Sequence, residues 1–162
     1  MIDVEFKINY NVYRKRLRNL HQRAIPWFKS GFKNVAKKGL QTIIEATPET
    51  SQGRTEIKDL WDLKHTSTTA TETFIIENLY PNQKVLMYFE KGTDAHVIEP
   101  TRKKFLHFFI DSSEVFTKIV FHPGTPAYKM VEKTRGELDA DVDAYVNYFF
   151  KSLDRLMGQG VG

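Results

Sequence analysis

The chain has 162 residues, a length that suits one domain with an ordinary core; 41% of the residues are hydrophobic and 27% are charged. It contains no cysteine, which excludes disulfides, thiolate catalysis and zinc sites with cysteine ligands. The net charge of +4 is uneven, because residues 1–38 hold ten Lys and Arg against two acids, which gives +8 there and −4 in the rest. A basic segment of this kind suits contact with a polyanion or an acidic protein face, although a solvated helix face explains it more simply.

The first 19 residues have charges spread through them and contain no apolar run. They do not resemble a secretory signal, and no segment approaches the ~20 apolar residues that a membrane span needs. We therefore expect a soluble protein with no membrane contact, made in a reducing compartment or indifferent to redox state.

Residues 11–46 are predicted to be helical, because apolar side chains recur there at steps of three to five. Pro26 has no amide hydrogen and would break or kink this helix, so two consecutive helices and one bent helix fit equally well. The basic side chains of this segment form a candidate face for a partner: Arg14, Lys15, Arg16, Arg18, Arg23, Lys29 and Lys33.

A polar, turn-forming loop is predicted at residues 47–55, because Pro and Gly occur there without an apolar anchor. The candidate residues of this loop are Pro48, Ser51, Gly53 and Arg54. After it, Thr-rich alternation followed by Phe74, Ile75 and Ile76 predicts two antiparallel strands within residues 65–79.

Residues 82–90 fit either a short helix or an extended segment that ends at Gly92, and a strand is expected at residues 96–98. Residues 104–111 and 114–122 flank Ser112–Ser113 and are predicted to form a β-hairpin. The aromatic and basic run 103–109 fits a groove for single-stranded nucleic acid, but a core-facing strand explains its alternation more simply.

The strongest periodic pattern predicts an amphipathic helix that begins near Glu137, with acids in its first turns and glycines after its end. The expected fold class is therefore α+β: an antiparallel β-sheet flanked by a long N-terminal helix and this C-terminal helix. We expect residues 1–162 to form a single domain.

Motifs for acyl transfer, nucleotide hydrolysis and dinucleotide binding are absent from the sequence, which leaves little support for an enzyme. One enzymatic alternative stays open, a metal-dependent nuclease or hydrolase. It would require four scattered side chains to converge: His96, Glu99, His107 and His122. Their spacings match no known ligand pattern, so the sequence itself predicts no metal and no cofactor.

Three phrases are more specific: ATPETSQGRTEIKDLW at 46–61, YFEKGTDAHVIEPTRKKFLHF at 88–108 and FTKIVFHPGTPA at 116–127. Their order and separation resemble the tail-completion or neck protein family of long-tailed phages, the small head-tail joining proteins. The positions that match are Pro48, Ser51, Gly53, Glu90, Gly92, Thr93, His96, Ile98, Pro100, Phe105, Leu106, Phe108, His122, Pro123, Gly124 and Thr125. The chain departs from the family where AYKMVEKTRGELD replaces a Pro-Phe-Leu segment, so we expect the last helix to start later or to pack differently.

The resemblance implies a structural virion protein that is not an enzyme: a hexameric ring at the head-proximal end of the tail tube, made in the host bacterial cytoplasm. Its implied partners are other copies of itself, in a ring that either exists alone or forms from monomers only in the assembled virion, the tail tube protein or the head connector (stopper) protein, and DNA that passes through the channel. In this interpretation the basic helix lines the channel or docks on an acidic ring, and the loop at 47–55 orders on assembly. The tail terminator, which caps the tube, is the alternative within the same class, and a free nucleic-acid binder is a further one.

The resemblance also gives the two Gly-Thr phrases a structural role. Gly92 and Gly124 are expected to allow positive φ or close approach, and Thr93 and Thr125 to hydrogen-bond the turns. We expect the two histidines of these phrases, at 96 and 122, to bond the neighbouring strand or loop and hold the corners in register.

Overall fold

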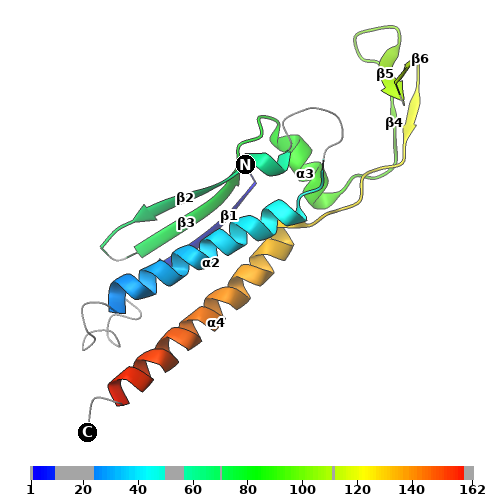
Figure 1. The fold of residues 1–162 in the computed structure, drawn as a ribbon. Helices are drawn as coiled ribbons and strands as arrows, with labels where there is room; N and C mark the ends of the chain where they lie inside the picture. Colours follow the sequence, from blue (N-terminus) through cyan, green and yellow to red (C-terminus); the bar gives the residue numbers. More distant parts are fainter. Residues whose placement is uncertain (1, 10–23, 50–56, 70, 111, 159–162) are drawn as a thin grey trace.

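The computed structural model describes residues 2–9, 24–49, 57–69, 71–110 and 112–158 (Figure 1). In chain order its elements are β1 (Asp3–Asn9), α2 (Ala24–Ala46), the 3-10 helix η1 (Ile57–Leu60), β2 (Trp61–Ser67), β3 (Thr71–Asn78), α3 (Gln83–Lys91), β4 (His96–Ile98), β5 (Leu106–Ile110), β6 (Ser113–Thr117), β7 (Val120–His122) and α4 (Met130–Gly158). The predicted α+β class is confirmed. The long helix α2 lies between β1 and β2 in the chain, and the long helix α4 is the last element.

The body of the molecule is built on a three-stranded antiparallel sheet in the order β1-β3-β2. The β2–β3 hairpin was predicted, although β2 begins at Trp61, earlier than the Thr-rich run. Strand β1 was missed by the sequence analysis. Its alternation is regular, with Val4 and Ile8 buried between exposed Asp3, Glu5 and Asn9, so a strand signal was present.

Helix α2 lies on one face of this sheet and runs antiparallel to α4 (Figure 1). The core between them is aromatic: the Phe28 ring lies 4.9 Å from Phe32 and 4.5 Å from Phe149, and all three side chains are fully buried. Gly31 of α2 lies under the Tyr145 ring of α4, where an added Cβ would lie 1.8 Å from Cζ. The glycine therefore allows the two helices to approach closely.

The described part of α2 begins at Ala24, so Pro26 lies in its first turn. At this place the missing amide hydrogen removes no helical hydrogen bond. The described part of the helix continues from there to Ala46. Residues 11–23 of the predicted helix lie outside the described residues, so a kink or break at Pro26 stays a prediction.

Helix α4 begins at Met130, so the predicted start near Glu137 was wrong. The physical reason is that the buried stripe continues upstream: Met130 and Thr134 are fully buried on the same face as Leu138. The sequence departure at residues 127–139 does not delay the helix.

The segment between α3 and α4 leaves the body as an arm, formed by residues 93–125 (Figure 1). Two short antiparallel ribbons build it, β4 with β7 and β5 with β6. The predicted strand 114–122 is interrupted at Lys118 and Ile119, which separate β6 from β7. The prediction of one antiparallel sheet was therefore wrong, because β4, β5, β6 and β7 pair with one another in the arm and not with the sheet of the body.

The run 103–109 lies in this arm, and its interpretation as a core-facing strand is also wrong. Phe105 is 46% exposed and Phe109 is 61% exposed. Alternation does mark the two faces of β5, but among the described residues no layer of the body covers the face that carries these rings.

Candidate functional site

The candidate site is the joint at which the arm leaves and rejoins the body, where the two Gly-Thr phrases meet. Thr93 N donates to Thr125 O over 2.9 Å, and Thr125 N donates back to Thr93 O over 3.1 Å. The Thr93 hydroxyl also accepts from Thr125 N at 3.0 Å. The threonines therefore bond the opposite phrase and bridge the two chain segments.

Both glycines of the joint have the left-handed backbone that was expected, with φ of 74° at Gly92 and 93° at Gly124. The close approach is reciprocal. A Cβ on Gly124 would lie 2.3 Å from Thr93 O, and one on Gly92 would lie 2.7 Å from Thr125 O. Since these neighbours are backbone atoms, only glycine fits at either position.

His96 and His122 face one another as a cross-strand pair between β4 and β7, with stacked rings 5.0 Å apart. Each ring bonds its own corner: His96 Nδ1 lies 2.8 Å from Asp94 O, and His122 Nδ1 accepts from Gly124 N at 3.1 Å. The histidines stack on each other across the ribbon, whereas each hydrogen bond stays within its own corner; that the pair holds the two corners in register stays a prediction.

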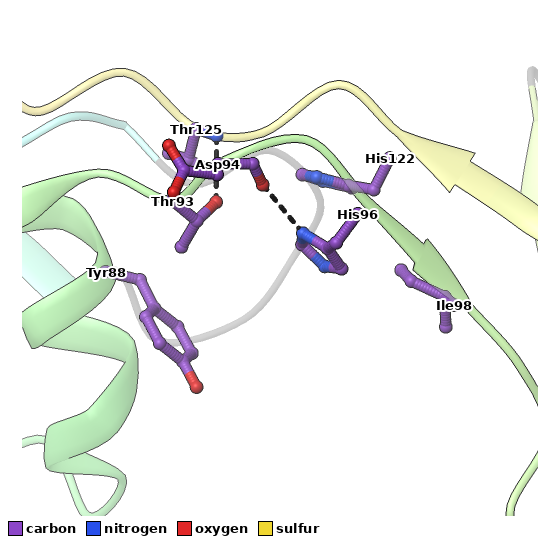
Figure 2. A pocket seen from close by; sticks show the side chains of 7 residues that line it. All are labelled: Tyr88, Thr93, Asp94, His96, Ile98, His122 and Thr125. Carbon is purple, nitrogen blue, oxygen red and sulfur yellow. Dashed lines mark hydrogen bonds between the residues drawn. The ribbon is translucent and has the colours of Figure 1, made fainter.

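An open pocket of ≈ 510 Å³ lies beside this joint (Figure 2). Figure 2 shows the Tyr88 ring, from α3, and the two imidazoles around one space. The pocket is lined by Tyr88, Thr93, Asp94, His96, Ile98, His122 and Thr125. Thr93, His96 and His122 each use one polar side-chain atom in the bonds of the joint, so these side chains help to build a junction between the two chain segments.

Glu90 was matched in the sequence but was assigned no function, and the structure gives it one. Its carboxylate accepts from the amides of Val131 and Glu132 at the start of α4, over 2.9 and 3.3 Å. A carboxylate at a helix N-terminus satisfies free amides and favours the helix dipole. Since Tyr128 N also donates to Phe89 O over 2.8 Å, the end of α3 is fastened to the beginning of α4 beside the joint.

The remaining predicted residues of the phrases lie along the first part of the arm. Ile98 pairs with Val120 in the β4–β7 ribbon. Pro100 follows that ribbon on one strand and Pro123 on the other. Prolines at these places end the pairing, because they cannot donate to a strand partner.

The predicted basic face is described only at its C-terminal end. Lys33 is exposed on α2, and Lys29 forms an ion pair of 3.0 Å with the buried carboxylate of Glu72 on β3. Lys29 therefore holds the helix on the sheet. The other members of the face, Arg14, Lys15, Arg16, Arg18 and Arg23, lie outside the described residues, so their role stays a prediction.

The predicted assembly loop is described only at its start. Pro48 is half-buried, and the Lys58 ammonium, 2.8 Å away, lowers the pKa of the exposed Glu49 by hydrogen bonding and charge. Ser51, Gly53 and Arg54 lie outside the described residues, and ordering of this loop on assembly stays a prediction.

The structure does not bring together the four side chains that the metal-dependent alternative needs. His107 belongs to β5 and pairs with Glu114 at 2.7 Å, while His96 and His122 stack at the joint. Among the described residues, no three His, Asp or Glu side chains gather so that they could hold a metal ion.

The fold and the joint together define an α+β body with a β-ribbon arm attached through backbone contacts. Comparisons with protein-family models, with curated proteins and with solved structures produced no match. In the part of the chain that the structure describes, no helix is both long and apolar enough to cross a membrane. The phage resemblance rests on the sequence phrases alone.

Proposed function

We propose that the protein is a structural component of a long-tailed phage virion, a tail-completion or head-tail joining ring at the head-proximal end of the tail tube. The observation that carries the proposal is the arm, whose two ends are bridged at Thr93 and Thr125 and which displays large apolar side chains. Such surfaces in a small protein mark contact sites with other proteins.

The exposed side chains of the arm support this proposal quantitatively. Phe116 is 61% exposed, Phe121 is 69% exposed and Val97 is 53% exposed. Burying a side chain of this size contributes about 1.5–3 kcal/mol, so several of them at one interface would supply much of an assembly contact. A joint built from reciprocal backbone bonds suits positioning of the arm.

The tail terminator is the alternative function within the same class, and one genetic experiment separates the two. An amber stop codon is placed in the gene within the phage or prophage that encodes the chain, and particles from a non-suppressing host are examined by electron microscopy. A tail-completion protein leaves filled heads and tails of normal length that do not join. A terminator leaves tails of irregular length.

Normal infectious particles from the amber mutant would refute both structural functions. A suppressing host that inserts the native residue serves as the control, since it should restore joined particles. A purified ring with a central hole in negative-stain images would agree with the proposal independently.

A further inference from the structure

We propose that the arm of one subunit docks on the exposed face of α4 of a second copy, so that identical joints run head to tail around the ring. This inference deepens the proposed function and rests on it. Two surfaces carry the inference, one on the arm and one on α4: the first is rich in cations and aromatic rings, and the second is acidic.

The first surface is the aromatic face of the arm, formed by Phe105, His107, Phe109, Phe116 and Lys118. Because residues directly opposite in a ribbon share a face, His107 and Phe116 lie side by side, with stacked rings 4.6 Å apart. The Phe109 ring lies 5.3 Å from His107, and the Lys118 ammonium lies 5.8 Å from the Phe105 ring centre. All five side chains are exposed, so this face presents a preassembled aromatic surface.

Four cations lie beside that aromatic face, and one acid lies on it, because Glu114 is opposite Phe109 and pairs with His107 at 2.7 Å. Arg102, Lys103 and Lys104 precede β5 and are all exposed, and Lys118 adds a fourth cation beside Phe105. Between residues 100 and 110 the sequence has no acid to balance them.

The second surface is the acidic stripe of α4, formed by Gly136, Asp139, Ala140, Asp143, Ala144 and Asn147. All six are exposed and lie at helical steps of three and four on the side opposite buried Leu138 and Phe149. No Lys or Arg occurs between residues 136 and 150. The small side chains leave a flat face, and an added Cβ on Gly136 would meet no atom within 4 Å.

The geometry requires a second copy rather than a fold-back within one chain. Figure 1 shows the arm reaching away from the body, whereas α4 runs from the joint in the other direction. Each copy therefore offers a basic, aromatic arm and a separate acidic, flat receptor. A contact between two different surfaces of the same molecule is heterologous, and it closes into a ring when the rotation between copies allows.

Mixing two charge-reversal variants tests this inference. The arm variant carries Arg102→Glu, Lys103→Glu and Lys104→Glu; the stripe variant carries Asp139→Lys and Asp143→Lys. Matched controls reverse exposed charges on the body: Lys7→Glu, Lys37→Glu and Lys84→Glu for the first, Glu5→Lys and Asp59→Lys for the second. Circular dichroism and thermal melting verify folding, and sedimentation velocity with native mass spectrometry gives the particle mass.

Wild type and controls should form closed oligomers, and each variant alone should weaken association about 100-fold, because like charges then face one another. An equimolar mixture should restore closed oligomers of alternating copies, since the wild-type arm of one variant matches the wild-type stripe of the other, and the reversed arm matches the reversed stripe. A protein that carries both reversals should regain the closed oligomer.

The inference is overturned if folded wild type stays monomeric at its highest soluble concentration, if either variant still assembles, or if the mixture stays monomeric. Loss of generic DNA binding by the arm variant without a change in mass would also overturn it, with nucleic acid as the occupant. If each variant alone still assembles and the amber mutant gives unjoined heads and tails, the interface is rejected and the proposed function stands. If wild type forms closed oligomers, neither variant does so alone, and the amber mutant gives normal particles, the interface stands and the proposed function is rejected.

Discussion

Gly124→Ala is expected to open the joint between arm and body while leaving the body folded. At a φ of 93° an L-residue is strained by about 1–3 kcal/mol. The new Cβ would also lie 2.3 Å from Thr93 O, a backbone atom that cannot move without breaking the bridge to Thr125. Each lost hydrogen bond removes roughly 1 kcal/mol. Together these contributions lower the local stability of the joint by about 3 kcal/mol.

Native-state hydrogen exchange measures this change directly, through the amides of Thr93 and Thr125. A loss of 3 kcal/mol corresponds to about 100-fold faster exchange at both amides. Exchange in β1, β2 and β3 should stay unchanged, because their core is formed by other residues. Gly136→Ala, at an exposed glycine of α4, is the control and should leave the joint amides as slow as in wild type. Unchanged exchange at the joint, or an equal loss of protection across the three-stranded sheet, would refute the reasoning.

Three further predictions concern the helices. Gly31→Ala should lower the free energy of unfolding by about 1–3 kcal/mol in urea titrations, because its Cβ displaces the Tyr145 ring. The control Gly136→Ala should raise the free energy of unfolding by ~1 kcal/mol. A Gly31→Ala variant more stable than wild type would contradict the close packing of α2 and α4. Tyr145 donates to Trp27 O and Phe28 O, both at 3.1 Å, and burial together with the nearby Tyr148 raises its pKa to about 12 from 10.0. Because the pKa of Tyr145 is higher in the folded state, its contribution to stability is complete below pH 10.0 and is lost as pH rises toward about 12. Tyr145→Phe should lower the free energy of unfolding by about 1 kcal/mol at neutral pH. Between neutral and alkaline pH, the free energy of unfolding of this variant should fall less than that of wild type. Glu90→Ala should lower the free energy of unfolding by about 1 kcal/mol, while Glu90→Gln, which keeps an acceptor, should lose less; equal losses would argue against the hydrogen bonds to the first amides of α4.

The elements that sequence patterns predicted well are those whose apolar faces pack on the body. The β2–β3 hairpin and the C-terminal helix both carry a regular stripe, and both are present. The start of α4 was misplaced because Lys129 to Arg135 contains mostly charged residues around only a few buried ones. Tertiary contacts decide that boundary, above all the bonds from Glu90, which is distant in sequence.

The arm could not be predicted from alternation alone. A strand that lies on a core and a strand in a free ribbon show the same period of two, and periodicity does not reveal which partner covers a face. At the joint, by contrast, local chemistry was informative: Gly92 and Gly124 were expected to need special backbone geometry, and both do. Their contact with each other was not foreseen, since nothing in a single sequence pairs residues 93 and 125.

The bridge between Thr93 and Thr125 also bears on how the protein can change over time. Because the chain leaves and returns at one point, the 31 residues between these threonines form a cassette whose ends are already adjacent. Lengthening, shortening or replacing that cassette would require no adjustment of β1 or α2, whereas a new arm face would have to match the acidic stripe of α4 on the next copy. Contact specificity in the arm and stability in the body are therefore free to evolve separately.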